Sequence, residues 1–292
     1  MTDPNLRVAF IGLGVMGYPM AGHLAKRGCT VTVFNRTHPR ALAWQTEFGG
    51  EVAATPAAAA RAADIVLTCV GNDRDARAVI LGADGALQGL RPGALLIDHT
   101  TASADIAREL AAACAVASVG FLDAPVSGGQ AGAERGQLTI MVGGEPDAFA
   151  RAEPVFAAYG KFARLMGTAG NGQLTKMVNQ ICIAGVVQGL SEGLAFAERN
   201  GLDGAAVVDV IAKGAAQSWQ MENRHATMLE RRFDFGFAVD WMRKDLGMTL
   251  EQGRRSGASL PLTALVDQFY ADVQRLGGGR WDTSSLIQRL RD

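Results

Sequence analysis

Three glycines separate an apolar run from a helical pattern near the start of the chain. Residues 6–11 form the apolar run. Gly12, Gly14 and Gly17 follow it at the spacing Gly-x-Gly-x-x-Gly. Between a strand and a helix, such glycines permit a tight turn, let a pyrophosphate approach the backbone and let the helix pack closely on the strand. The spacing therefore predicts a dinucleotide-binding loop. Its expected cofactor contacts are Gly12, Leu13, Gly14, Met16 and Gly17.

Repeated strand–helix units extend over the first half of the chain. Short apolar runs alternate with alanine-rich helical patterns, and most runs are continuous, which is typical of a parallel sheet covered on both faces. We therefore predict a doubly wound α/β domain of the Rossmann type over residues 1–165. The predicted strands are residues 6–11, 30–34, 65–69, 94–98, 121–123 and 138–142, and the predicted helices are residues 16–27, 41–48, 103–113 and 146–159.

Only helical patterns follow the first half. Residues 171–199 repeat apolar side chains at about helical spacing, with glycines as the main interruptions. No alternation typical of strands appears after this segment, so residues 166–292 are predicted to form an all-helical domain. Further helices are predicted at residues 205–213, 219–230, 240–254 and 263–276.

The balance of charge argues against nucleic acid or an anionic membrane as a partner. Lys and Arg number 28 against 29 Asp and Glu, which gives a net charge of −1. The four cysteines lack the paired spacing of a zinc or disulfide framework, so no metal site and a cytoplasmic location are expected. The N-terminal residues lack a signal-peptide pattern, and no uninterrupted apolar run reaches the roughly 20 residues that cross a bilayer.

The end of the second predicted strand indicates which dinucleotide is bound. NAD-preferring enzymes usually place Asp or Glu there, where the side chain binds the ribose hydroxyls. This chain has Asn35, Arg36 and Thr37 instead. Arg36 can pair with a 2′-phosphate, to which Asn35 and Thr37 can hydrogen-bond. These residues favour NADP(H), with NAD(H) as the alternative. The competing interpretation makes Arg36 a solvated loop residue.

Three further segments carry motifs: Asp123–Gly129 (DAPVSGG), Gly170–Gln180 (GNGQLTKMVNQ) and Lys244–Leu246 (KDL). Together with Phe10–Gly28, their order and spacing resemble the 3-hydroxyisobutyrate dehydrogenase family, also called the β-hydroxyacid dehydrogenases. The resemblance covers nearly the whole chain. His23 departs from it, because the family commonly has Asn there; this departure indicates a divergent branch and leaves the substrate open.

The resemblance places the family's catalytic lysine on Lys176. Hydride transfer to a carbonyl leaves an alkoxide, which an ammonium group can stabilise and protonate. In the oxidation direction the neutral amine takes the alcohol proton, which favours a pKa below about 10.4. Burial or a second cation can lower the pKa of a lysine, and Lys244, which matches a second family lysine close to the cofactor, would be that cation. Without the resemblance, Lys176 would be interpreted as a solvated surface residue.

The resemblance also implies the residues that hold the substrate. Ser127, Gly128 and Gly129 match the family's carboxylate-binding loop, which uses a hydroxyl and backbone N–H groups. Asn179 lies three residues after Lys176 on the same helical face, where it would orient the substrate or the lysine.

Other residues have competing interpretations. Thr101 matches a position near the nicotinamide, with Thr100 as the competing choice. His99 and His225 are interpreted as structural because no partner pattern supports a general acid, and Asp245 is expected to form a structural ion pair. Trp219, Phe237 and Trp241 shape a substrate pocket or pack in the core.

The expected reaction is hydride transfer between NADP(H) and a small 3-hydroxyacid or its semialdehyde. The candidates are 3-hydroxyisobutyrate, tartronate semialdehyde and a 3-hydroxy amino acid. The resemblance implies that the helical domain contributes to the substrate cleft and builds a homodimer or homotetramer. One alternative is an imine reductase of the same fold, which generally has Asp or Tyr where Lys176 stands. The other is a non-catalytic NADPH-binding module, which would be expected to lose Lys176 or the Ser-Gly-Gly loop.

Overall fold

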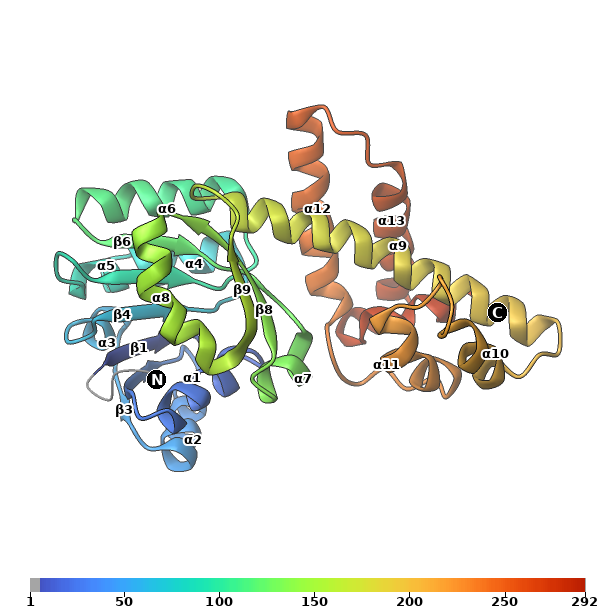
Figure 1. Cartoon of the computed structure of the whole chain (residues 1–292), viewed down its shortest axis with the longest axis horizontal. Coiled ribbons are helices and arrows are strands. Elements are labelled where there is room, and N and C mark those ends of the chain that lie inside the picture. Colours follow the sequence, from blue (N-terminus) through green and yellow to red (C-terminus); the bar gives the residue numbers. More distant parts are fainter. Residues whose placement is uncertain (1–5, 292) are drawn as a thin grey trace. The chain divides into compact units, whose positions relative to one another are not determined.

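The computed structural model describes residues 6–291, so the expectation about a signal peptide falls partly outside the described residues. The chain forms two compact units, Met1–Lys176 and Met177–Asp292 (Figure 1). The division lies inside the long helix α9 (Asn171–Arg199), whereas the sequence predicted it before this helix, at residue 165. The difference arises because the first turn of α9 is hydrogen-bonded to loops and strand ends of the first unit.

The first unit is built on one sheet with the strand order β3-β2-β1-β4-β5-β6-β8-β7, and β9 pairs with β8. All six predicted strands are present. The additional strands β3, β7 and β9 were not predicted. The strands are β1 (Arg7–Ile11), β2 (Thr30–Phe34), β3 (Glu51–Val52), β4 (Ile65–Thr68), β5 (Leu95–Asp98), β6 (Gly120–Asp123), β7 (Val126–Ser127), β8 (Leu138–Gly144) and β9 (Gly160–Leu165).

The sheet is parallel from β3 to β6, as predicted, and mixed beyond β6. Strand β8 runs antiparallel to β6 and to β7, and β9 runs parallel to β8. The connection from β7 to β8 spans only residues 128–137. A parallel crossover needs a dozen or more residues, so the chain returns antiparallel at this point. The predicted doubly wound domain therefore carries a mixed edge beyond β6.

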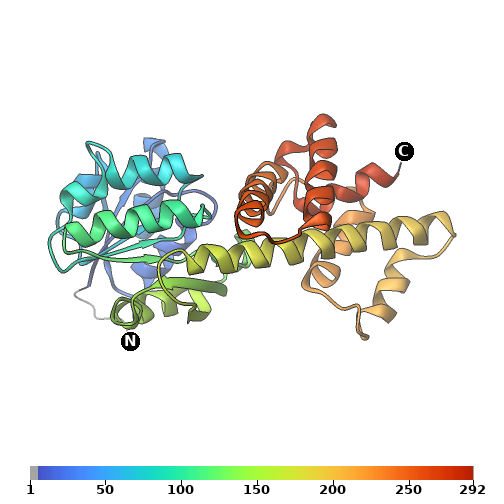
Figure 2. The ribbon, with the colours of Figure 1, turned by 90° about the horizontal axis from the view of Figure 1, so that it is seen from above.

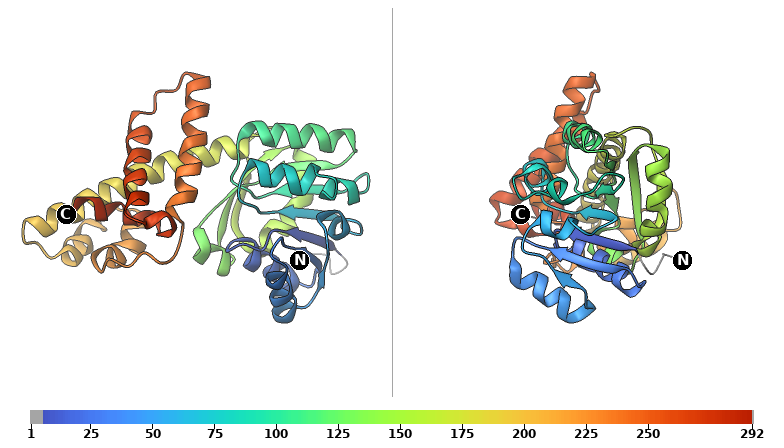
Figure 3. Two further views of the ribbon diagram at one scale, coloured as in Figure 1. Left: turned by 180° about the vertical axis from the view of Figure 1, so that it is seen from behind. Right: turned by 90° about the vertical axis from the view of Figure 1, so that its left-hand side faces the viewer.

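Helices cover both faces of this sheet, which confirms the predicted fold class (Figures 2 and 3). Strand β1 shows the arrangement, because Val8 and Phe10 enter one core while Ala9 and Ile11 enter the other. The helices against the first core are α1 (Gly17–Lys26), α2 (His38–Phe48), α7 (Gly129–Glu134) and α8 (Pro146–Tyr159); those against the second are α3 (Pro56–Ala60), α4 (Asp73–Leu81), α5 (Ala86–Gly89) and α6 (Ala104–Val116).

The second unit is helical, as predicted. Within residues 177–291, strand pairing is confined to an isolated bridge between Ala238 and Asp282. One core joins α9 to α12 and α13, and a second joins α9 to α10 and α11. The elements that follow α9 are α10 (Gly204–Ile211), α11 (Trp219–Leu229), α12 (Val239–Ser256), α13 (Pro261–Arg275) and the 3₁₀ turns η1 (Gly278–Arg280) and η2 (Thr283–Leu290).

Among the described residues, α9 is the one helix that is long and apolar enough to cross a membrane by length and composition. Half of its most apolar window is buried inside the protein. The core helix of a protein can have the same length and apolar composition, so these two properties are weak support for a membrane span.

His99 follows β5 and is fully buried. Its Nδ1 atom donates to the Ala124 carbonyl at 2.6 Å, and its Nε2 atom accepts from the Tyr159 hydroxyl at 2.9 Å. Burial lowers the pKa of His99 to about 4. The ring is therefore neutral at pH 7 and joins β5, the segment after β6 and α8, in agreement with the structural role predicted for it.

The buried imidazole should weaken the fold in mild acid. In the unfolded chain His99 takes up a proton near pH 6.5, whereas in the folded protein it does so only near about 4. The unfolded state binds more protons in this window, so the free energy of unfolding falls as the pH drops, by roughly 3 kcal/mol over the whole window. We expect His99→Gln, which cannot titrate, to lose less stability than the wild type between about pH 7 and about pH 5 in urea unfolding. Equal losses would contradict this origin of the acid sensitivity.

Candidate active site

The glycine loop connects β1 to α1 at the point where the sheet order reverses. A Cβ atom on Gly12, whose φ is +97°, would lie 2.3 Å from the Cys69 carbonyl oxygen. A Cβ atom on Gly17 would lie 2.0 Å from the Gly12 carbonyl oxygen, whereas one on Gly14 would meet nothing within 4 Å. Each glycine thus has the environment that its predicted role requires: a tight turn, a close helix–strand contact and an open approach.

The start of α1 suits an anionic ligand. Met16 at its N-terminus makes no side-chain cap bond, and the first turn holds no acidic residue. Backbone N–H groups at such a helix end bind phosphate well. Since the space above Gly14 is also open, the loop fits the pyrophosphate of a dinucleotide.

Leu13 and Asn35 stabilise the conformation of this loop. The Leu13 side chain is fully buried, and its N–H donates to Asn35 Oδ1 at 2.9 Å. Asn35 Nδ2 donates to the Thr37 carbonyl at 3.0 Å. The Asn35 amide therefore ties the glycine loop to the β2–α2 connection. That Asn35 hydrogen-bonds a 2′-phosphate and that Leu13 contacts the cofactor stay predictions.

Arg36 and Thr37 remain on the surface beside this connection. The Arg36 side chain is 89% exposed, and its Nη1 atom lies 3.7 Å from Asp75 Oδ1 on α4. Such an exposed pair contributes little stability, so Arg36 can turn toward a ligand at small cost. Thr37 precedes α2 without capping it through its side chain. Their role in binding a 2′-phosphate stays a prediction.

Arg40 is a basic residue at this loop that the sequence analysis missed. Its Nε donates to the Leu13 carbonyl, and its guanidinium lies 5.1 Å from the Tyr18 ring centroid. Its position in the first turn of α2, directly after the Asn35–Thr37 segment, was the available signal.

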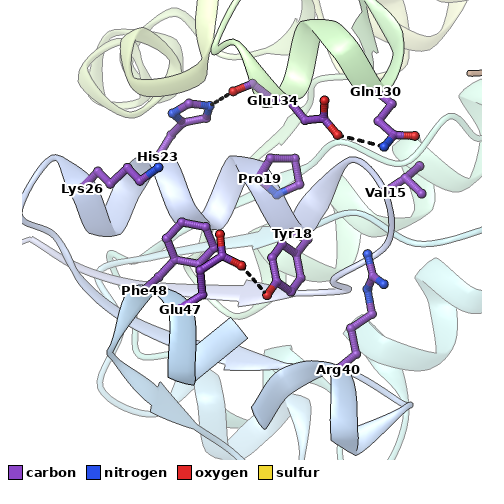
Figure 4. Close-up of a pocket in the computed structure, with 10 residues that line it drawn as sticks. All are labelled: Val15, Tyr18, Pro19, His23, Lys26, Arg40, Glu47, Phe48, Gln130 and Glu134. Atoms are coloured by element: carbon purple, nitrogen blue, oxygen red, sulfur yellow. Dashed lines mark hydrogen bonds between the residues drawn. The ribbon is translucent and has the colours of Figure 1, made fainter. Parts of the chain in front are cut away.

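A pocket of mixed charge lies beside Arg40, between α1, α2 and α7 (Figure 4). Tyr18 donates to Glu47 at 2.8 Å on one side, and His23 bonds the Glu134 carbonyl at 3.1 Å on the other. None of the predicted site residues lines this pocket, but Val15 of the glycine loop and Arg40 do, so the pocket adjoins the loop. Its lining is Val15, Tyr18, Pro19, His23, Lys26, Arg40, Glu47, Phe48, Gln130 and Glu134.

The two threonines after β5 have different surroundings. Thr100 is buried; its Oγ1 accepts from the Val70 N–H at 3.1 Å, and its N–H donates to Asp98 Oδ1 at 3.0 Å. Thr101 is partly exposed. The structure therefore favours Thr101 over Thr100 as the residue that faces a ligand.

The Ser127–Gly129 segment forms a sharp turn after β7. Ser127 is partly exposed, and Gly128 and Gly129 have φ values of +135° and +61°. Side chains other than glycine adopt these conformations rarely, so the turn depends on both glycines. That this turn binds a substrate carboxylate stays a prediction.

Lys176 is only 7% exposed, which excludes the interpretation as a solvated surface residue. It lies on α9 at the end of the first unit. Lysine is rarely buried to this extent without a specific role.

In the second unit, a polar chain joins α9 to α12. Asn179 Nδ2 donates to Gln180 Oε1 at 2.7 Å, and Gln180 Nε2 donates to Asp245 Oδ2 at 2.7 Å. Lys244 Nζ lies 3.2 Å from Asp245 Oδ1, so Asp245 forms the predicted ion pair. Gln180 was not predicted as part of the site. Residues 6–291 hold no group of three or more His, Cys, Asp or Glu side chains placed to bind a metal.

The environments of Gly17 and Gly14 predict that an added methyl group affects stability at Gly17 and dinucleotide binding at Gly14. We expect Gly17→Ala to lower the free energy of unfolding by about 3 kcal/mol, because its Cβ would meet backbone. Gly14→Ala should leave stability within about 0.5 kcal/mol of wild type. The same variant should weaken dinucleotide binding at least about tenfold, because the methyl group fills the pyrophosphate approach. Urea unfolding and fluorescence titration measure the two effects, and unchanged binding by Gly14→Ala would contradict this position of the pyrophosphate.

Two family models match this chain. Residues 7–179 match the family model of the NAD-binding domain of 6-phosphogluconate dehydrogenase. Residues 170–290 match the model described as NAD-binding of NADP-dependent 3-hydroxyisobutyrate dehydrogenase. The two models together span both units.

Individual relatives match over nearly the full length. An uncharacterised oxidoreductase of Shewanella frigidimarina (strain NCIMB 400) is 62% identical, over 97% of this chain and 98% of the relative. The probable 3-hydroxyisobutyrate dehydrogenase-like 1, mitochondrial, of Arabidopsis thaliana is 42% identical, over 99% of this chain and 86% of the relative. The structure of Mycobacterium tuberculosis 3-hydroxyisobutyrate dehydrogenase with L-serine is 31% identical, with a TM-score of 0.88, over 99% of this chain and 100% of that chain. With its glycine loop, buried lysine and these matches, the chain belongs to the 3-hydroxyisobutyrate dehydrogenase family of NAD(P)-binding oxidoreductases.

Proposed function

We propose that this protein transfers a hydride between NADP(H) and a small 3-hydroxyacid or its semialdehyde, with Lys176 as the general acid and base. The substrate class comprises 3-hydroxyisobutyrate, tartronate semialdehyde and 3-hydroxy amino acids. The family supports this class, and the Mycobacterium relative, described with L-serine, supports the hydroxy amino acids.

The burial of Lys176 is the observation that carries the proposal. The dinucleotide supplies the hydride in the reductive direction and accepts it in the oxidative one. During reduction, the Lys176 ammonium donates a proton to the oxygen that becomes the hydroxyl. During oxidation, the neutral amine accepts that proton. Few water molecules compete at a side chain that is 7% exposed, so its charge acts strongly on a developing alkoxide.

The turn after β7 would hold the substrate carboxylate. Ser127 offers a hydroxyl, and Gly128 and Gly129 offer backbone N–H groups without side chains in the way. Asn179, bonded to Gln180, would orient the substrate or Lys176. These contacts would distinguish a hydroxyacid from a simple alcohol.

The residues at the end of β2 would select the dinucleotide. Arg36 would pair with the 2′-phosphate of NADP, and Thr37 would hydrogen-bond to it. NADP is favoured because no carboxylate stands at this strand end to repel the phosphate or bind the ribose hydroxyls. Lys244 would lie near the cofactor and Thr101 near its nicotinamide. NAD(H) remains the alternative cofactor.

We also propose that the protein is a cytoplasmic homodimer or homotetramer built by its helical unit. Light scattering coupled to gel filtration tests the oligomeric state directly; a monomer at micromolar concentration would contradict it.

The role of Lys176 is tested by replacing it with an apolar side chain of similar length. We expect Lys176→Met to lower kcat by about a thousandfold, because a general acid–base group contributes on that scale. NADPH binding should remain. The assay follows NADP⁺ reduction by absorbance with 3-hydroxyisobutyrate, glycerate, L-serine and L-threonine. Lys161→Met, at an exposed position on β9, is the matched control.

Two outcomes would contradict the proposal. If Lys176→Met turns over substrate at the wild-type rate, Lys176 is not the acid and base. If the wild type binds NADPH tightly but oxidises no member of the panel, the imine reductase and the non-catalytic module become the better interpretations.

The cofactor preference is tested at Arg36. We expect Arg36→Gln to raise the dissociation constant of NADPH about tenfold to a hundredfold, the loss of one charge-assisted contact. The dissociation constant of NADH should change by less than about twofold, because NADH lacks the 2′-phosphate. Arg61→Gln, at an exposed position after α3, is the control. Equal weakening of both dinucleotides by Arg36→Gln would overturn this assignment.

A further inference from the structure

Gln173, in the first turn of α9, makes two side-chain hydrogen bonds to the loop after β5. The side chain is 1% exposed. Its Nε2 donates to the Thr100 carbonyl at 2.7 Å, and its Oε1 accepts from the Ala102 N–H at 3.0 Å. These two backbone groups flank Thr101. One carboxamide therefore holds the backbone on both sides of the residue that the proposed function places near the nicotinamide.

The backbone of the same turn is fixed by a second strand end. Asp123, at the end of β6, accepts from the Gln173 N–H at 2.9 Å and from the Gly170 N–H at 2.7 Å. A carboxylate at the start of a helix satisfies N–H groups that have no partner within the helix. Asp123 thus fixes the backbone of the helical turn from which the Gln173 side chain reaches the backbone around Thr101.

The helix can sit this close to the sheet only because Gly172 has no side chain. A Cβ atom on Gly172 would lie 2.6 Å from the carbonyl oxygens of both Asp123 and Met141. The first turn of α9 therefore rests directly on the end of β6 and on the middle of β8. Little room remains for it to shift.

Lys176 follows Gln173 by three residues, so the two side chains share a face of α9. Helical side chains lean toward the N-terminus, which directs the Lys176 stem back over the turn that contains Gln173. The same short segment thus carries Lys176 and fixes the Thr101 backbone.

We propose that Gln173 is a positioning residue that holds Lys176 and Thr101 in the relative positions that proton and hydride transfer require. The inference rests on the proposed function of Lys176. The carboxamide suits this position because it donates and accepts at once, through two atoms on one rigid plane. An ionised carboxylate can accept from the Ala102 N–H but repels the Thr100 carbonyl. A methionine side chain can make neither hydrogen bond.

The test compares Gln173→Met and Gln173→Glu with Gln188→Met. Gln188 lies on the same helix, is also buried, and donates to Glu192 at 2.6 Å, so it matches the general effect of removing a buried amide from α9. We expect both Gln173 variants to lower kcat at neutral pH by about tenfold to a hundredfold, the usual cost of misplacing a reacting group by about 1 Å. The dissociation constant of NADPH should stay within about threefold, and the thermal midpoint should fall no further than in Gln188→Met.

A pH series separates positioning from a general loss of structure. When its introduced carboxyl is protonated, the Gln173→Glu variant can donate to the Thr100 carbonyl and accept from the Ala102 N–H, as the amide does. The Gln173→Met variant can make neither bond at any pH. Burial raises the pKa of such a carboxyl, which brings its protonation closer to neutral pH. We therefore expect the kcat of Gln173→Glu, relative to that of Gln173→Met at the same pH, to rise as the pH is lowered.

The elements packed near this position carry the charged groups Asp73 on α4, Asp98 at the end of β5, Asp123 on β6, Arg108 on α6 and Lys176 on α9. These groups are present in both Gln173 variants, so the ratio of the two kcat values isolates the introduced carboxyl. The inference is overturned if the Gln173 variants keep wild-type kcat or if their kcat falls no further than that of Gln188→Met. It is also overturned if the ratio of the Gln173→Glu kcat to the Gln173→Met kcat does not change with pH. Lys176→Met, measured alongside, distinguishes a failure of this inference from a failure of the proposed function. If Lys176→Met keeps the wild-type kcat, the proposed function itself is refuted.

Discussion

The carboxylate of Asp123 connects the sheet of the first unit to the helix that carries Lys176. It accepts two backbone N–H groups from the start of α9 while it is fully buried. Burial raises its pKa to about 6, and the two hydrogen bonds act against that rise. A buried carboxylate is costly without such partners. The two hydrogen bonds offset this cost in part, and they fix the position of α9, on which the proposed chemistry depends.

Other strand ends in the same sheet act in a similar way. Asn35, after β2, holds the Leu13 N–H of the glycine loop. Asp98, at the end of β5, accepts from the Thr68 hydroxyl at 2.6 Å and from the Thr100 N–H. Buried polar groups that are fully hydrogen-bonded keep loops in a single arrangement. The loops that would meet the dinucleotide and substrate are therefore ordered by the protein itself, which is the condition for efficient hydride transfer.

Periodicity predicted the elements whose side chains face a core and missed those that are short or polar. All six predicted strands are present because continuous apolar runs mark strands buried on both faces. Strands β3 and β7 have two residues each and show no period. Helix α4 escaped prediction because its sequence, DRDARAVIL, buries only Ala76 and Ile80. The antiparallel return of β8 depends on which strands become neighbours, and no local pattern specifies that.

The sequence by itself determined the glycine loop, the two-part architecture, the family and the position of Lys176, because these depend on local spacing and periodicity. Only the tertiary structure decided that the Asn35 amide serves Leu13, that Arg40 reaches the glycine loop, and that Lys176 is buried. It also revealed Gln173, whose partners lie 71 and 73 residues away along the chain. Strand order sets such partnerships, because it brings the ends of parallel strands to one edge of the sheet.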